Sequence, residues 1–264
     1  PVGLAAGFDK NAERVPFWDA LGFGFVEVGS VTARSSDGNP TPRAFRLPDD
    51  GALVNRMGLN NDGAAAIAAR LASTALPDRF VLGVNVAKTH SPDILGDAAL
   101  DDFATSVRYV ARHAAYLALN VSCPNTAEGK TFESPDALDA RNGLLTRVLA
   151  VLDDLGVRPP VLVKFSPPTL ADGAPDFGGV DELVALCLRH GVDGFIATNT
   201  ASDRAGLTTD AATLAEIGRG GLSGAPLQAR STALVRRRYQ CTDGAVPIIG
   251  VGGVDSSAAA YEKI

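Results

Sequence analysis

The chain of 264 residues is poor in cysteine and contains no long apolar run. Its cysteines are Cys123, Cys187 and Cys241, an odd number with no CxxC pair and no Cys/His spacing typical of zinc sites. This usage argues against a disulfide framework, predicts no metal site and fits a protein of the reducing cytosol. No apolar stretch approaches the roughly 18 residues that a membrane-spanning helix needs.

Positive charge is also scarce, because the formal net charge is −6. Proteins that bind nucleic acids usually present a basic face, so the balance disfavours that class. The one basic run, residues 236–238, lies in a helical pattern and is expected to form a solvated helix face. Cys187 lies on an apolar helical stripe, which predicts a place in the core.

The sequence does contain a regular alternation of short β-branched runs and Ala- and Leu-rich helical patterns. This alternation predicts a parallel sheet covered by helices. The strand runs are apolar on both faces, as a buried parallel sheet requires, and no low-complexity linker divides residues 1–264 into separate domains. The seven predicted strands are VGLAAG (2–7), FVEVGSV (25–31), FVLGVNVAK (80–88), YLALNVS (116–122), VLVKFSP (161–167), GFIATNT (194–200) and VPIIGVGG (246–253).

Polar residues follow nearly every predicted strand. An open doubly wound sheet could hold seven strands, but it would use only one point along its edge for binding. In a closed barrel the carboxyl ends of all strands meet at one mouth, where functional groups gather. Lysines and amides at six strand ends therefore favour a (β/α)8 TIM barrel whose eighth βα unit would follow Ile264. We expect residues to be missing at both ends of this sequence.

Two long segments without a helical pattern are expected to be loops. In residues 32–56, the runs AFRL and ALVN could pair as a small hairpin over the barrel mouth. The second loop, residues 200–224, ends in GRGGLSG.

The predicted mouth is rich in amides and carries two lysines. Several amides together suggest a small planar ligand with both donors and acceptors, since each amide offers both. Lys10 and Lys164 follow apolar strands, where lysine usually meets an anion. The glycine-rich turns IGVGG (249–253) and GGLSG (220–224) are candidate phosphate sites, because exposed backbone N–H groups bind anions.

Cys123 lies at the end of a predicted strand, directly before Pro124. No histidine lies nearby in the sequence to form a protease-like pair. A thiol with a pKa near 8.5 suits the removal of a proton from a weakly acidic carbon, so we interpret Cys123 as a candidate base.

Eight segments in chain order resemble the dihydroorotate dehydrogenases, and in particular the class 2, membrane-associated, quinone-using branch. The segments are GLAAGFDKN, VEVGSVT, NRMGLNN, NVSCPNT, VLVKFSP, IATNT, GGLSG and IGVGG. The resemblance extends over the whole chain. It implies an α/β barrel, bound FMN and the oxidation of dihydroorotate to orotate in pyrimidine (UMP) biosynthesis.

The resemblance also implies roles for individual residues. Cys123 would be the catalytic base, and Lys164 would lie against the isoalloxazine ring and stabilise its anionic reduced form. The implied cofactor-binding residues are Ala6, Gly7, Lys10, Ser30, Asn85, Asn120, Lys164, Thr198, Gly224 and Gly253. The implied substrate-binding residues are Lys10, Asn55, Arg56, Met57, Gly58, Leu59, Asn120, Asn125, Asn199 and Thr200.

One residue departs from the class 2 pattern, because Cys123 stands where that class normally has serine. Cysteine there is typical of class 1, whose acceptors are fumarate or, through a partner subunit, NAD. Class 1 does not carry GLAAGFDKN or NRMGLNN in this form, so the framework favours a quinone. The class 2 resemblance implies a cytoplasmic protein held peripherally at the inner face of the cell membrane by a segment absent from this sequence.

Two other functions stay open. One is a different FMN-dependent oxidoreductase acting on a pyrimidine or on tRNA uridine, although the acidic charge disfavours tRNA. The other is a degenerate barrel that serves only as a binding module. Such a module would not need Cys123, Lys164 and the amides.

Overall fold

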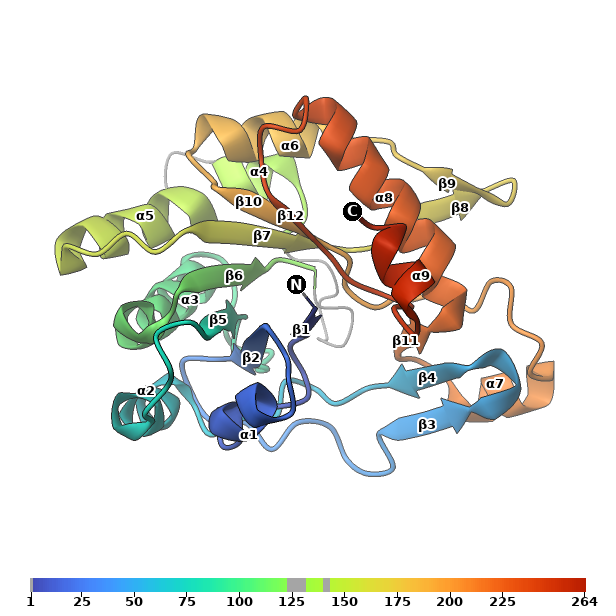
Figure 1. Cartoon of the computed structure of the whole chain (residues 1–264), viewed down its shortest axis with the longest axis horizontal. Coiled ribbons are helices and arrows are strands. Elements are labelled where there is room, and N and C mark those ends of the chain that lie inside the picture. The colour runs from blue at the N-terminus through green and yellow to red at the C-terminus, as the bar shows by residue number, and fades with distance from the viewer. Residues whose placement is uncertain (1, 123–131, 140–142) are drawn as a thin grey trace.

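Seven parallel strands form one curled sheet in the order β1-β2-β5-β6-β7-β10-β12. The computed structural model describes residues 2–122, 132–139 and 143–264. Figure 1 shows the curl of the sheet, with helices on its outer side. The strands are β1 (Gly3–Leu4), β2 (Phe25–Val31), β5 (Val81–Val86), β6 (Tyr116–Asn120), β7 (Val161–Phe165), β10 (Gly194–Ala197) and β12 (Ile248–Gly250). Each of the seven predicted strands is present, so the predicted strand pattern is confirmed.

The outer face of the sheet packs against the helices. The described α-helices are α1 (Val15–Ala20), α2 (Ala64–Ser73), α3 (Asp97–Val110), α4 (Pro135–Asp139), α5 (Leu144–Leu155), α6 (Val180–Arg189), α7 (Ala211–Ile217), α8 (Gln228–Cys241) and α9 (Ser257–Tyr261). Short 3₁₀ turns lie at Pro48–Asp50, Ala111–His113 and Ala225–Leu227. Val84, Leu117 and Val163 point outward from neighbouring strands into the large core, to which helices α1 to α6 contribute buried residues. Cys187 is fully buried in the same core, which confirms its predicted place.

The inner face of the sheet carries a separate, smaller apolar cluster of Tyr116, Ala118, Leu162 and Ile196. Side chains alternate between the two faces along each strand, so residues two apart share the inside. Gly83 gives the Tyr116 ring its space, because a Cβ at Gly83 would lie 2.1 Å from the ring carbon Cζ. The interior is therefore filled at this depth, as in barrels of this size.

A second sheet of three antiparallel strands joins the predicted hairpin to a distant segment. Its order is β11-β4-β3, with β3 (Ala44–Leu47), β4 (Ala52–Asn55) and β11 (Gly221–Gly224). The pairing of β3 with β4 confirms the predicted hairpin. Figure 1 shows the hairpin extending to one side of the curled sheet. A small cluster that includes Leu47, Val54 and Leu222 forms its core.

The prediction of an unbroken loop over residues 200–224 is wrong. The segment contains α7, which Asp210 caps by accepting hydrogen bonds from the backbone N–H groups of Ala212 and Thr213. It also contains β11, so GGLSG is largely a strand hydrogen-bonded to β4 rather than a free glycine turn. Glycine-rich sequence disfavours strands, so this one depends on its pairing with β4 and with the backbone of Ala201.

A further hairpin was not predicted. It consists of β8 (Thr169–Ala171) and β9 (Ala174–Asp176), and it contains no buried residue. Asp172 and Gly173 both have positive φ angles, as the central residues of a type I′ turn require. The Asp-Gly pair was the available signal.

The predicted solvated face at residues 236–238 is wrong for one residue. Arg236 is exposed and Arg237 pairs with Asp181, but Arg238 is only 1% exposed. Its guanidinium carbon lies 4.1 Å from the ring centroid of Phe165 and 5.0 Å from that of Phe195. Residue 238 follows the buried Ser231 and Leu234 at helical spacing, so α8 turns it toward the sheet.

We expect Gly83→Ala to destabilise the protein by about 1–3 kcal/mol, the usual cost of overpacking a filled core. The free energy of unfolding from denaturant titration measures this loss. In the double variant Gly83→Ala/Tyr116→Leu the clash is absent, so the two changes together should cost at least about 1 kcal/mol less than their sum. Strictly additive losses would contradict the close approach as the cause.

Candidate functional site

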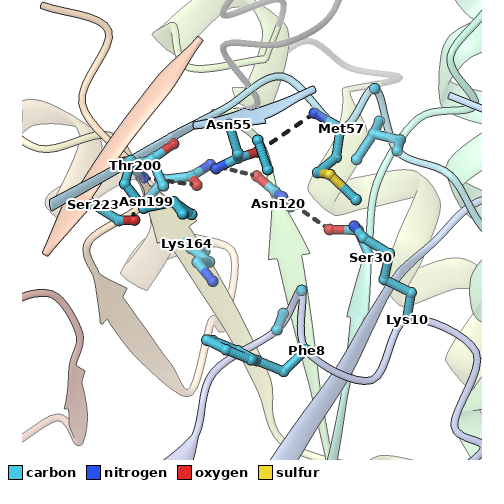
Figure 2. A pocket seen from close by; sticks show the side chains of 16 residues that line it. Phe8, Lys10, Ser30, Asn55, Met57, Asn120, Lys164, Asn199, Thr200 and Ser223 are labelled. Atoms are coloured by element: carbon cyan, nitrogen blue, oxygen red, sulfur yellow. Dashed lines mark hydrogen bonds between the residues drawn. The ribbon is translucent and has the colours of Figure 1, made fainter. Parts of the chain in front are cut away.

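A cleft of about 290 Å³ opens where the carboxyl ends of the strands meet the β3–β4 hairpin. Figure 2 shows its polar side chains converging from several strands and loops. The lining residues are Ala6, Gly7, Phe8, Lys10, Ser30, Ala44, Leu53, Asn55, Met57, Gly58, Leu59, Asn120, Lys164, Asn199, Thr200 and Ser223. The cleft is therefore both polar and apolar, as sites for small planar ligands usually are.

Most of the predicted site residues meet in this cleft. Of the residues predicted to bind the cofactor, Ala6, Gly7, Lys10, Ser30, Asn120 and Lys164 line it. Of those predicted to bind the substrate, Lys10, Asn55, Met57, Gly58, Leu59, Asn120, Asn199 and Thr200 line it. Cys123 and Asn125 lie outside the described residues.

Five predicted residues do not line the cleft. Arg56 turns away: its guanidinium lies 4.6 Å from the Phe45 ring centroid and donates to the backbone carbonyls of Ile217 and Arg219. Asn85 lies beneath Ser30 and supports it. Thr198 is buried and donates its hydroxyl to the carbonyl of Asn199. The other two are Gly224 and Gly253.

Four lining residues were not predicted, namely Phe8, Ala44, Leu53 and Ser223. Phe8 was within the quoted GFDKN motif, and the residue is 74% exposed. Ala44 and Leu53 belong to the hairpin that was expected to cover the mouth. Ser223 was within the quoted GGLSG segment, but the sequence gives no sign that β11 reaches the hairpin.

The amides of the cleft form one continuous chain of hydrogen bonds. Asn199 Nδ2 donates to Asn120 Oδ1 at 3.1 Å, and Asn120 Nδ2 donates to Ser30 Oγ at 3.1 Å. Ser30 Oγ donates in turn to Asn85 Oδ1 at 2.5 Å, and Asn85 Nδ2 donates to Glu27 Oε1 at 2.9 Å. Every link donates in the same direction, so each amide has a defined orientation.

The chain of hydrogen bonds ends at Glu27, a residue that the sequence reasoning missed. Glu27 is 3% exposed and lies on β2, pointing into the barrel. Its Oε1 lies 3.3 Å from the Lys164 ammonium group, and its Oε2 accepts from the Tyr116 hydroxyl at 3.3 Å. Burial and the adjacent carboxylate raise the pKa of Tyr116, which therefore remains a donor. The available signal was a carboxylate in the middle of the apolar run FVEVGSV.

The hairpin that forms one wall of the cleft is tied to the loop before α7. The Asp50 carboxylate accepts hydrogen bonds from the backbone N–H groups and the hydroxyls of Thr208 and Thr209. The backbone N–H of Thr208 is the largest of several contacts that lower the Asp50 pKa to about 2. These contacts therefore favour the ionised carboxylate.

Comparison with known proteins identifies the family. The family model described as dihydroorotate dehydrogenase matches residues 1–264. The chain belongs to the dihydroorotate dehydrogenase family. It is 41% identical to the dihydroorotate dehydrogenase (quinone) of Nitrosospira multiformis, over all of this chain and 72% of that protein. It is 46% identical to the protein of the same name from Chloroflexus aurantiacus, over 96% of this chain and 68% of that protein.

A solved structure of another dihydroorotate dehydrogenase has the same fold. The crystal structure of the Eimeria tenella protein in complex with ferulenol superposes with a TM-score of 0.88 at 36% sequence identity. The match covers all of this chain and 72% of that one. Together with the seven curled parallel strands, it confirms the TIM-barrel class predicted from the sequence.

The described residues contain neither a membrane-spanning helix nor a cluster of metal ligands. Among these residues no helix is long and apolar enough to cross a membrane. In the same part of the chain, no group of three or more His, Cys, Asp or Glu side chains could hold a metal ion.

We expect acid to release the hairpin from the loop before α7. Because the folded-state pKa of Asp50 lies below its usual value of 3.8, its contacts are present above pH 4 and are lost as the pH falls through about 2. Amide hydrogen exchange at Thr208 and Thr209 should therefore accelerate between pH 4 and pH 2, after correction for the intrinsic rate. Asp50→Asn should show the faster exchange already at pH 6, whereas Asp49→Asn on the exposed neighbour should not. Equal protection in Asp50→Asn and wild type would contradict this assignment.

Proposed function

We propose that this chain is the catalytic barrel of a quinone-dependent dihydroorotate dehydrogenase, which oxidises dihydroorotate to orotate in pyrimidine biosynthesis with FMN as its cofactor. The observation that carries the proposal is the family match over the whole chain, at positions that build one cleft of lysines and amides. The names of the relatives support the quinone as electron acceptor.

The cleft suits a flat, polar heterocycle. Gly7 has a φ of +110°, and the position where its Cβ would be is open space within the cleft. A ring could therefore approach the backbone there, as glycine permits. Lys164 and Lys10 bring positive charge, while Asn120 offers an amide of fixed orientation. This donor-rich lining fits FMN, whose ring has carbonyl and nitrogen acceptors.

We assign the residues to two sides of the reaction. Ala6, Gly7, Lys10, Ser30, Asn120 and Lys164 would hold the cofactor, with Asn85, Thr198, Gly224 and Gly253 supporting it from outside the cleft. Asn55, Met57, Gly58, Leu59, Asn199 and Thr200 would hold dihydroorotate, together with Lys10 and Asn120. Bound FMN would supply the acceptor for the hydride that leaves carbon six of the substrate.

Cys123 would remove the proton from carbon five. The assignment follows from its position in NVSCPNT, directly after the β6 strand whose last residue is Asn120. A thiol is a stronger acid than the serine hydroxyl of class 2 relatives, so it provides a base nearer to neutral pH. Because proton removal occurs on the substrate side, a cysteine base is compatible with any electron acceptor.

We further propose that the protein works in the cytoplasm and docks peripherally on the inner face of the cell membrane, where a lipid-soluble quinone is available. The proposed membrane location depends on quinone being the electron acceptor. If Cys123 instead marks class 1 behaviour, fumarate or NAD would replace the quinone.

The purified protein is expected to be yellow and to lose its flavin absorbance when dihydroorotate is added without oxygen. In steady state, a soluble quinone should support faster turnover of dihydroorotate than fumarate or NAD does. A flavin that dihydroorotate leaves oxidised would reject the proposed substrate. Fumarate turnover above quinone turnover would reject the class 2 assignment and give Cys123 the greater diagnostic weight.

Cys123→Ala should retain FMN and reduce the rate of flavin bleaching by roughly 10²–10⁴-fold, the usual contribution of a positioned base. Cys123→Ser should keep partial activity and require higher pH, because a hydroxyl ionises far less readily than a thiol. Stopped-flow bleaching measures both effects. Cys241→Ser on α8 is the matched control and should stay within threefold of wild type. A bleaching rate in Cys123→Ala that also stays within threefold of wild type would exclude the thiol as base.

A further inference from the structure

Glu27 is a buried charge that the proposed function does not use. It lies in the middle of β2, between Val26 and Val28, which both point outward into the large core. Its own side chain points inward and is 4% exposed. A carboxylate buried to this degree costs several kcal/mol unless it is paired and hydrogen-bonded, so its partners explain its presence.

The partners of Glu27 are all donors. Lys164 and Asn85 both approach Oε1, at 3.3 Å and 2.9 Å, and the Tyr116 hydroxyl approaches Oε2 at 3.3 Å. Among them only Lys164 carries a charge, and its side chain is 6% exposed. Lys164 and Glu27 therefore form a buried ion pair inside the barrel.

Lys164 faces two ways. It is bound to Glu27 on the barrel side, and it also lines the cleft, where Figure 2 shows its ammonium group reaching into the open space. A ligand in the cleft therefore meets the Lys164 cation with a carboxylate directly behind it. In a low-dielectric interior a second charge at this range weakens the field of the first substantially.

We propose that Glu27 is a positioning residue that holds Lys164 at the cleft and that its negative charge lowers the reduction potential of the bound flavin. This inference rests on the proposed function, since it takes FMN as the ligand. Lys164 favours the negative charge that reduction brings, and Glu27 opposes it. The two residues therefore act on the flavin with opposite signs, although they form one ion pair.

Glu27→Gln removes the charge and can keep every hydrogen bond. The oxygen of the new side-chain amide can take the place of Oε1 and accept from Lys164 and Asn85. The amide nitrogen can take the place of Oε2 and donate to Tyr116, whose hydroxyl both donates and accepts. The directed chain from Asn199 to residue 27 is then preserved, so the variant isolates the charge.

The measured quantity is the affinity of the protein for reduced relative to oxidised FMN, obtained from the midpoint potential at pH 6.5. Glu27→Gln should raise this ratio by about tenfold, the order of magnitude of a single buried charge nearby. For a two-electron couple, tenfold corresponds to about 30 mV upward. Lys164→Gln should lower the ratio by a similar factor.

Tyr116→Phe is the matched control. It removes one hydrogen bond from Glu27 and leaves the carboxylate charge in place, so the ratio should change by less than about twofold. Glu27→Asp keeps the charge on a side chain that is shorter by one methylene group. Its affinity ratio should be closer to that of wild type than the ratio of Glu27→Gln is. A merely structural role for Glu27 would instead make these variants change FMN affinity in both redox states without changing the ratio.

A ratio in folded, FMN-bound Glu27→Gln that rises by less than threefold, or falls, would overturn the inference. If Glu27→Gln does not fold, the same rise is expected between Lys164→Gln and the double variant Glu27→Gln/Lys164→Gln, and its absence there has the same meaning. Redox dyes set the potential without dihydroorotate. A wild-type flavin that equilibrates with dyes but is not reduced by dihydroorotate would therefore reject the proposed function alone, whereas failure to bind FMN would overturn both.

Discussion

The buried contact between Glu27 and Lys164 is the interaction on which the cleft depends. Burying either charge alone would be costly, and the contact between Lys164 and Glu27 offsets that cost for both. Once the carboxylate is in place, Asn85 must present its amide nitrogen to it, and Ser30, Asn120 and Asn199 follow in turn. One acidic residue far below the rim thus fixes which way the amides at the rim point.

Apolar side chains support this polar layer from inside the barrel. Tyr116, Ala118, Leu162 and Ile196 fill the interior beneath it, and Gly83 makes room for the largest of them. Because interiors are close-packed, the polar side chains have no space to move deeper into the barrel. They therefore keep their positions relative to the cleft. The outward-facing strand residues pack with the helices in a separate core and stabilise the fold. The inward-facing residues line or support the cleft.

Much of this arrangement could be predicted from the sequence, because period and composition report on local structure. The seven strands and the β3–β4 hairpin were predicted correctly, and most of the residues predicted to bind ligands line one cleft. What local patterns do not encode is the partner of a segment. Strand β11 exists because β4 lies beside it. Arg238 is buried because α8 turns it onto Phe165, although the two residues before it are also arginines. Arg56 was assigned to the substrate from the resemblance, but it lies outside the cleft and its guanidinium donates to the carbonyls of Ile217 and Arg219.

The sequence analysis missed Glu27 for a different reason. A single carboxylate in an apolar strand is a local contradiction, and only the distant Lys164, Asn85 and Tyr116 resolve it. Contradictions of this kind often mark functional positions, since a fold retains a costly group where it has a task.

The pairing of β11 with β4 has a consequence for the order in which the molecule is completed. Ser223 Oγ donates to the carbonyl of Leu53 across 170 positions of sequence. At synthesis rates of about 5–20 residues per second, β11 is made roughly 10–30 s after β4. Until then β4 has an open edge, and Ser223 is absent from the wall of the cleft. The nascent chain therefore contains six strands of the curled sheet, β1, β2, β5, β6, β7 and β10, before it has a finished binding site.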